Sequence, residues 1–181
     1  MRILRAGAHK RMPWKNGAGV TTEIAIAPEG AAIDSFDWRI SMAKVPDSGP
    51  FSAFAGIDRV LAVLDGAMNL QVGAGTPVKL DSTSRAIPFP GDIPTRADVI
   101  ETVTDLNVMV RRGRFTARVT LLERQELTAE AKETFLLLRS KAALHTGETV
   151  EIDDVIHLAR GDMLAFVRIP ESCWLIEINA S

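Results

Sequence analysis

A polar segment near residue 20 carries the side chains best suited to binding a small charged molecule. The segment reads Trp14-Lys15-Asn16-Gly17-Ala18-Gly19-Val20-Thr21-Thr22-Glu23. It combines a cation, an amide, two hydroxyls and a carboxylate, and its two glycines let the backbone approach another group closely. We expect Lys15 and Asn16 to hold an anion, with Trp14 covering the apolar part of that anion. A surface loop with a turn and no ligand is the alternative interpretation.

Arginines at three further positions suit a carboxylate, because the planar guanidinium donates two parallel hydrogen bonds to it. Arg39 interrupts an alternating apolar strand, Arg59 begins another strand, and Arg111 opens a basic cluster that runs to residue 118. A half-buried arginine needs a partner, so an internal ion pair with Glu23 or Asp105 is the alternative to a ligand. For the basic cluster, a solvated face is favoured over contact with nucleic acid.

Metal and nucleophile chemistry has little support in the sequence. The three histidines are His9, His145 and His157, which leaves none between residues 10 and 144. A barrel that binds iron, manganese or zinc brings several histidines and a carboxylate together, so we expect no metal and no other cofactor. The single cysteine, Cys173, has no neighbouring base in the sequence, which favours a packed structural thiol.

Short alternating runs separated by turn residues predict the elements that position these groups. In the run 20–26, alternate apolar residues share one face and Glu23 lies on the other. Many such runs with regular Gly, Pro and Asp turns are typical of an all-β sandwich or barrel. One short helix is expected over residues 127–135, where Thr128 would cap it. An exposed connection over residues 123–133 is the alternative.

Two Gly-Asp turns indicate an internal duplication of the β pattern. Asp65-Gly66 followed by Pro90-Gly91-Asp92 in the first half corresponds to Thr146-Gly147 followed by Arg160-Gly161-Asp162 in the second. Each pair fits a hairpin whose return strand begins after a tight glycine turn. Chance recurrence is the alternative, and the similar strand patterns around both turns favour duplication. We therefore expect Gly91 and Gly161 at equivalent turns.

The composition bounds the class of protein. The chain has 181 residues, of which 46% are hydrophobic and 24% are charged, the usual balance of a soluble globular protein rather than a disordered chain. The formal net charge of −2 argues against broad electrostatic binding to nucleic acid or to an anionic membrane. The sequence shows neither a signal peptide nor an apolar run long enough for a membrane helix, so we expect a cytoplasmic protein.

Five motifs, taken in order, resemble those of the HutD/Ves family. They are the segment 14–23, then Phe36-Asp37-Trp38-Arg39-Ile40-Ser41, Gly49-Pro50-Phe51-Ser52 with Gly56-Ile57-Asp58-Arg59, Phe89-Pro90-Gly91-Asp92, and Asp105-Leu106-Asn107-Val108-Met109-Val110-Arg111. The resemblance runs from residue 13 to about residue 112, and the second half of the chain agrees only in pattern.

The resemblance implies a bicupin, in which two antiparallel jelly-roll β-barrels pack together in one chain. The N-terminal barrel, residues 1–112, would hold the ligand pocket, and the C-terminal barrel would span residues 113–181, with an N-terminal strand allowed to cross over. It also implies a role in moderating bacterial histidine breakdown by binding an intermediate of the N-formylglutamate or urocanate class. Every histidine that metal-binding cupins carry at their two motifs is absent here, so metal-dependent chemistry is not implied.

We therefore predict a metal-free cupin protein that binds a small carboxylate and regulates histidine catabolism. Basic groups would hold the carboxylates of the ligand, and aromatic rings would form its apolar wall. The candidate ligand-binding residues are Trp14, Lys15, Asn16, Thr22, Glu23, Arg39, Ser41, Phe51, Arg59, Asn107 and Arg111.

Two other functions stay open. A metal-independent enzyme acting on a small carboxylate would use Glu23 as general base, with Lys15 or Arg39 stabilising developing negative charge. An interaction module would pair its sheet edges with a partner or with a second copy of the chain, as in a homodimer. Turnover of histidine-pathway intermediates would identify the first function, and a large apolar surface patch would identify the second.

Overall fold

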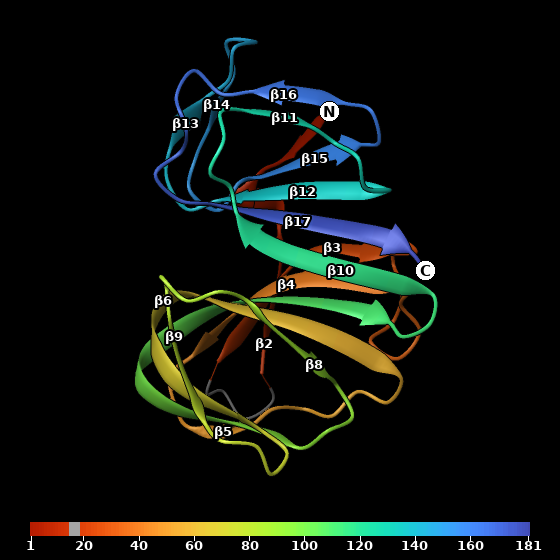
Figure 1. Ribbon diagram of the computed structural model, residues 1–181, viewed down its shortest axis with the longest axis vertical. Helices are drawn as coiled ribbons and strands as arrows, with labels where there is room; N and C mark the ends of the chain where they lie inside the picture. The colour runs from red at the N-terminus through yellow and green to blue at the C-terminus, as the bar shows by residue number, and fades with distance from the viewer. Residues whose placement is uncertain (15–18) are drawn as a thin grey trace. The chain divides into compact units, whose positions relative to one another are not determined.

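Nearly all regular structure in this protein is β-strand. The computed structural model (Figure 1) describes residues 1–14 and 19–181, and over these residues the only helix is a single 3₁₀ turn, η1 (Ala6–Ala8). The expected all-β class is therefore confirmed. None of the helical structure in this part of the chain is long and apolar enough to cross a membrane. The chain divides into an N-terminal unit, Lys10–Thr116, and a C-terminal unit that joins Met1–His9 to Ala117–Ser181.

The N-terminal unit is built on one eight-stranded sheet whose paired strands run antiparallel. In chain order its strands are β2 (Lys10–Pro13), β3 (Val20–Ala27), β4 (Trp38–Val45), β5 (Gly49–Pro50), β6 (Ile57–Val72), β7 (Val78–Asp81), β8 (Ile87–Pro90) and β9 (Thr95–Arg111). Six of them lie in the order β2-β3-β4-β9-β6-β7, while β5 pairs with β9 and β8 pairs with β6.

The longest strands, β6 and β9, pair along most of their length and bend at Gly66. The sequence predicts a turn at Asp65-Gly66, and that prediction is wrong, because β6 runs through both residues with a shifted register. Gly66 has φ +78°, and a Cβ at this position would lie 2.2 Å from the carbonyl oxygen of Thr102. Glycine thus permits a β-bulge here, so Asp65-Gly66 does not correspond to the turn at Thr146-Gly147.

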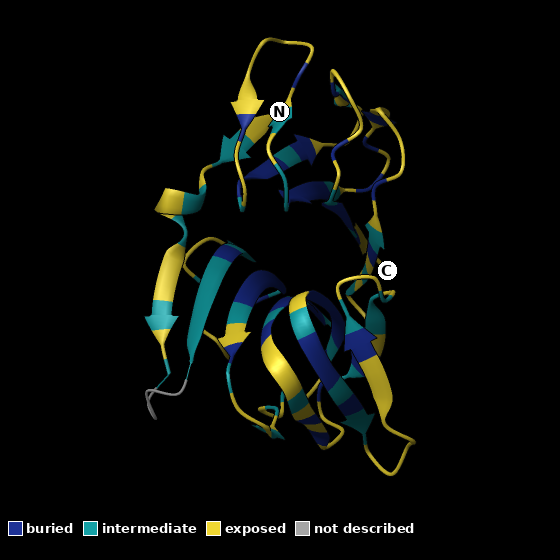
Figure 2. Ribbon diagram, turned by 90° about the vertical axis from the view of Figure 1, so that its left-hand side faces the viewer, coloured by how far each residue is buried: buried dark blue, intermediate teal, exposed yellow. Residues whose placement is uncertain are grey.

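One side of the N-terminal sheet, which we call the core side, carries a cluster of buried apolar side chains. This cluster includes Leu61, Met68, Leu80, Phe89 and Val103. In Figure 2 the strands are mainly buried or intermediate, and many of the connecting turns are exposed. Burial stabilises the fold by roughly 25 cal/mol per Å² of apolar surface, so this cluster is a main source of stability in the unit.

The C-terminal unit is built on a five-stranded sheet. Its strands are β1 (Arg2–Leu4), β10 (Phe115–Leu121), β12 (Glu133–Leu138), β15 (Val155–Ala159) and β17 (Cys173–Ala180), in the order β1-β15-β12-β17-β10. Two short pairs complete the unit: β11 (Glu126–Thr128) with β16 (Met163–Ala165), and β13 (Ala142–Ala143) with β14 (Thr149–Val150). The N-terminal strand therefore belongs to this unit, since β1 pairs only with β15 among the described strands.

The predicted helix over residues 127–135 is wrong. Strands β11 and β12 occupy this segment. Strand β12 pairs with both β15 and β17, and it places Leu136 and Leu138 in the core of the C-terminal unit. Sheet pairing and burial therefore decide the structure of residues that, taken alone, are good helix formers.

Four strands have the same order in the two units. In chain order they are β4, β6, β8 and β9 in the N-terminal unit, and β10, β12, β15 and β17 in the C-terminal unit. Within each sheet, neighbouring strands follow the same order, in which the third strand of the set lies beside the second, the second beside the fourth, and the fourth beside the first. Gly91 follows the third strand of one set and Gly161 follows the third strand of the other. The two turns require glycine for different reasons. Gly161 has φ +88°, a left-handed conformation, whereas Gly91 is needed for space, because a Cβ there would lie 2.9 Å from the carbonyl oxygen of Ile57.

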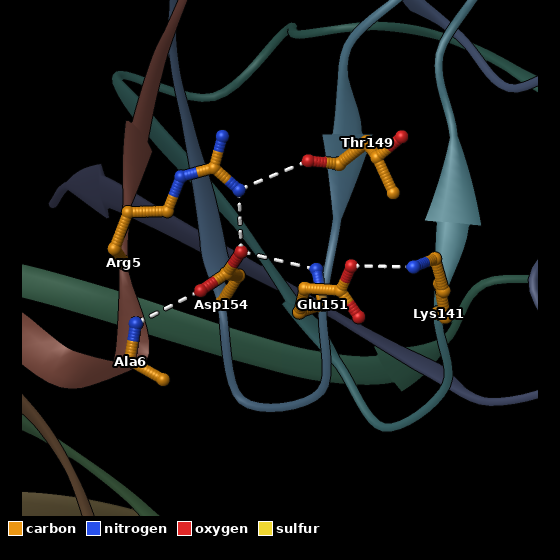
Figure 3. Close-up of polar contacts among 6 residues, drawn as sticks. All are labelled: Arg5, Ala6, Lys141, Thr149, Glu151 and Asp154. Atoms are coloured by element: carbon orange, nitrogen blue, oxygen red, sulfur yellow. Dashed lines mark hydrogen bonds and ion pairs between the residues drawn. The ribbon is translucent and has the colours of Figure 1, made fainter.

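Asp154 ties the N-terminal segment to the rest of the C-terminal unit (Figure 3). Its side chain is 4% exposed, and its carboxylate accepts hydrogen bonds from the Arg5 guanidinium at 2.7 Å, the Ala6 N–H at 2.8 Å and the Glu151 N–H at 3.0 Å. Burial alone would raise the pKa of Asp154, but these hydrogen bonds and the charge of Arg5 outweigh it and lower the pKa below its usual value. Asp154 is therefore ionised and fully bonded at neutral pH.

Asp154→Asn should lower the free energy of unfolding at pH 7 by about 1–3 kcal/mol, because charged hydrogen bonds to a buried group are lost. The folded-state pKa lies below the unfolded value, so the wild-type carboxylate stabilises the fold above roughly pH 4, and this contribution disappears as the pH falls further. Urea titrations at pH 7 and pH 3 measure both effects, and the difference between the proteins should narrow at pH 3.

The matched control is Glu151→Gln, which removes an ion pair with Lys141 in which both side chains are largely exposed. It should change the free energy of unfolding by less than about 0.5 kcal/mol. A loss in Asp154→Asn that is no larger than in this control would show that Asp154 does not hold the N-terminal segment.

Candidate functional site

Strand pairing brings polar side chains together on the core side of the N-terminal sheet. Glu23 of β3 pairs with Ser41 of β4, and Ser41 pairs with Asn107 of β9. Arg39 and Asp105 each lie two residues before one of these positions, so they share the same side of the sheet. We define the polar cluster as Glu23, Arg39, Ser41, Arg59, Asp105 and Asn107.

The Arg39 guanidinium is buried and makes one ion pair. Its Nε donates to Glu23 Oε2 at 2.7 Å, and Arg39 is 5% exposed. Its Nη1 and Nη2 groups donate no hydrogen bond to the described residues. Neither nitrogen is a fully buried unpartnered atom, so both groups are available for a further acceptor.

Arg59 is 3% exposed and is held mainly by aromatic rings. Its guanidinium carbon lies 5.0 Å, 5.1 Å and 5.7 Å from the ring centres of Phe51, Phe89 and Phe54. Its Nε donates a long hydrogen bond of 3.4 Å to Asn107 Oδ1, and its Nη1 donates to the Ser52 carbonyl oxygen at 3.2 Å. Cation–π contacts stabilise the charge without using N–H groups, so Nη2 is left without an acceptor among the described residues.

Asp105 is almost fully buried and only partly bonded. It is 1% exposed, and its Oδ1 has no hydrogen-bond partner among the described residues. Burial raises the pKa of Asp105 to about 7, although the charge of Arg59 and a hydrogen bond from the Ala43 N–H oppose the rise. Burial also lowers the pKa of Arg59 to about 10, with the charge of Asp105 opposing that shift. Arg59 is therefore still protonated at neutral pH.

The polar cluster favours an anion over a metal ion. Its fixed charges are two arginines and Glu23, and Asp105 titrates near neutrality, so protonation of Asp105 leaves an excess of positive charge. Two guanidinium groups would repel a divalent cation, and no histidine occurs between residues 10 and 116. In the part of the chain that the structure describes, no three or more His, Cys, Asp or Glu side chains form a metal-binding group.

Two predicted site residues do not join the polar cluster: Thr22 lies on the other side of the sheet, and Arg111 bonds to the backbone. Thr22 pairs with Met42 and lies on the side of β3 opposite to Glu23, because neighbouring side chains alternate. Arg111 donates through Nε and Nη2 to the carbonyl oxygen of Phe36, at 3.1 Å and 2.6 Å. Arg111 thus bonds to the chain itself, and Thr22 is not brought to the cluster.

The polar segment before β3 is described only at its ends. Trp14 donates from Nε1 to Thr21 Oγ1 at 2.8 Å and packs against the core of the N-terminal unit. A Cβ on Gly19 would lie 2.8 Å from the Trp14 ring, so glycine is needed for this close approach. Lys15 and Asn16 lie outside the described residues.

Three members of the site are missing from the sequence-based prediction. From the sequence, Asp105 is expected only as a possible ion-pair partner of an arginine. Its spacing of two residues from Asn107 on one strand could have indicated that both side chains lie on the same side of the sheet. Phe54 lies between β5 and β6 in the chain and Phe89 lies in β8, and both contact Arg59. No local pattern identifies either ring as a contact of Arg59, since tertiary structure alone brings them to the guanidinium.

Asp105→Asn should stabilise the protein, and more at pH 8 than at pH 4. The pKa of this carboxyl is about 7 in the folded protein against an ordinary value of 3.8, so wild-type stability falls as the pH rises through this interval. The neutral amide avoids that loss, by on the order of 1–3 kcal/mol at pH 8. Chemical denaturation at both pH values measures the difference. A variant that is less stable than the wild type at pH 8 would contradict the assignment.

Comparison with known proteins gives the family. The model of the HutD family matches residues 6–175. An uncharacterised 21.2 kDa protein from the hutC 3′ region of Pseudomonas putida is 31% identical over 186 residues, covering 98% of this chain and 97% of that protein. Protein Ves of Cronobacter sakazakii is 33% identical over 138 residues, covering 74% of this chain and 75% of that protein.

Solved structures agree with this assignment. HutD from Pseudomonas fluorescens SBW25 has a TM-score of 0.83 at 27% identity, with coverage of 99% of this chain and 98% of that chain. A conserved protein of unknown function from Pseudomonas aeruginosa PAO1 has a TM-score of 0.80 at 32% identity, with 98% of each chain covered. A cupin 2 conserved barrel domain protein from Leptotrichia buccalis, 8% identical, covers 95% of this chain and 96% of that chain with a TM-score of 0.56 and shows the fold alone. The chain has a cupin-like all-β fold and belongs to the HutD family.

Proposed function

We propose that the N-terminal unit binds a small carboxylate without a metal ion, and that this binding regulates histidine catabolism. The observation that carries the proposal is the pair of buried guanidinium groups, Arg39 and Arg59, which retain N–H donors with no acceptor among the described residues. A carboxylate is the planar acceptor that such groups hold best. Ligands of the N-formylglutamate or urocanate class supply one.

The C-terminal unit supports a functional origin for the buried charges. The buried cluster of this unit includes Leu136, Leu158, Phe166 and Leu175, and the buried polar residues among its described residues are Thr134 and Asp154. The same strand order can therefore be filled without a buried arginine. Because a buried ion pair is often no more stabilising than apolar packing, retention of two arginines in the N-terminal unit points to a ligand rather than to stability.

We propose that the two units are cupin barrels related by duplication. The shared order of four strands, the corresponding places of Gly91 and Gly161, and the cupin-like neighbours support this arrangement. Under this proposal one barrel keeps a polar interior for a ligand, and the other keeps an apolar interior for stability.

The link to histidine catabolism rests on relatives of the chain. The Pseudomonas putida relative is named for its position beside hutC, and the family carries the name HutD. A protein that binds a pathway intermediate without converting it can report or limit the concentration of that intermediate. Such binding is the form of regulation that this site supports.

A metal-independent enzyme is the second candidate, and the structure changes its proposed base. Glu23 is a poor general base because Arg39 holds its carboxylate at 2.7 Å. Asp105 is better suited, since burial raises its pKa to about 7 and a group that titrates near neutrality transfers protons efficiently. Consumption of N-formylglutamate or urocanate by the wild type, abolished in Asp105→Asn, would establish this function instead.

Arg39→Met should weaken binding of N-formylglutamate or urocanate by about 1.5–3 kcal/mol, the range for a hydrogen bond to a charged group. Isothermal titration calorimetry measures the change. Arg39→Lys keeps the charge but not the planar group, so it should fall between the wild type and Arg39→Met. A thermal melt of each variant shows whether it is folded.

The control is Arg96→Met, which removes an exposed arginine of the same unit that pairs with the exposed Asp98. Its affinity should equal that of the wild type. Equal affinity in a folded Arg39→Met protein, or equal losses in both variants, would show that the polar cluster is not the carboxylate site.

A further inference from the structure

An unsatisfied acceptor lies among the groups of the polar cluster. Asp105 Oδ1 is buried and has no donor among the described residues, while the Ala43 N–H donates to the same carboxyl group. Buried carboxylate oxygens are normally bonded, because leaving one without a donor is costly. By strand pairing, the side chain of Asp105 lies on the same side of the sheet as those of Arg39 and Asn107.

The surroundings of Asp105 do not supply the missing donor. The other charged side chains that strand pairing places on this side of the sheet include Arg59 of β6, Arg39 of β4, Glu23 of β3, Arg111 of β9 and the exposed Lys10 of β2, which pairs with Glu23. Arg111 donates to the carbonyl oxygen of Phe36. The recorded N–H bonds of Arg59 go to Asn107 and Ser52, and that of Arg39 goes to Glu23. The donors of Arg59 and the acceptor of Asp105 thus lie on one side of the sheet, close enough for their charges to interact, and each group lacks part of its hydrogen bonding.

We propose that the ligand carries a hydrogen-bond donor, an N–H or O–H, beside its carboxylate, and that Asp105 Oδ1 accepts that donor. This inference rests on the proposed carboxylate site, which supplies the other half of the ligand. Arg39 and Arg59 hold the carboxylate, and Asp105 selects among carboxylates by what they carry next to it. A plain dicarboxylate leaves Oδ1 unbonded, so it binds less well.

The proposal predicts opposite effects of pH on two kinds of ligand. A donor on the ligand favours ionised Asp105, so its affinity rises with pH through the titration of this carboxyl. A dicarboxylate without a donor meets repulsion from ionised Asp105, so its affinity falls over the same interval. Ordinary carboxylates stay ionised between pH 6 and pH 8, which leaves Asp105 as the group that changes.

The test measures binding of three diacids that share a five-carbon chain by calorimetry: N-formylglutamate with an N–H, 2-hydroxyglutarate with an O–H, and glutarate with neither. In the wild type at pH 8, at least one of the two donor compounds should bind about 10- to 100-fold more tightly than glutarate. That preference should fall to within about threefold in Asp105→Leu, which has nearly the same shape and no acceptor. Asp98→Asn, which changes an exposed carboxylate of the same unit, should keep the wild-type preference. From pH 8 to pH 6 the affinity for the preferred donor compound should fall about tenfold, and that for glutarate should not fall.

The outcomes separate this inference from the proposed function. Glutarate that binds the wild type as tightly as both donor compounds would overturn the inference and leave the carboxylate site intact. A preference that survives in a folded Asp105→Leu protein would show that Asp105 does not recognise the donor. Absence of binding by all three compounds and by urocanate would overturn the carboxylate site itself.

Discussion

The buried guanidinium of Arg59 is the feature on which the chemistry of the N-terminal unit depends. A cation that is 3% exposed loses its hydration, and the protein replaces that hydration with aromatic rings, a carbonyl oxygen, an amide and the nearby Asp105. The rings stabilise the charge while leaving N–H groups unused. An arginine held in this way is oriented before a ligand arrives, which reduces the entropy lost on binding.

Arg59 and Asp105 control each other's protonation. Burial pushes each group toward its neutral form, and the charge of each group opposes the shift of the other. An anion bound near Arg59 adds negative charge and so disfavours ionised Asp105. A ligand donor that bonds to Asp105 favours the ionised form and offsets this effect. The polar cluster is therefore expected to be less stable without a ligand than an apolar filling would be, which is the usual relation between a binding site and the stability of its fold.

Sequence patterns predicted the parts of this structure that depend on local alternation. The alternation of residues 20–26 and 36–42 places Glu23 and Arg39 on one side of neighbouring strands, and the two side chains form an ion pair. The same rule could have identified Asp105 beside Asn107. It failed at Gly66, where a bulge replaces a turn, and over residues 127–135, where sheet pairing replaces a helix. Both failures arise because distant strands decide the local conformation.

Arginine side-chain NMR tests the central claim most directly. In protein labelled with ¹⁵N-arginine, the Nε–Hε signals of Arg39 and Arg59 are assigned by substitution and followed during titration with N-formylglutamate. Both signals should shift and saturate together, while the signal of exposed Arg96 should not move. Signals of Arg39 and Arg59 that stay fixed while the ligand binds elsewhere would contradict the assignment of a carboxylate site to the polar cluster.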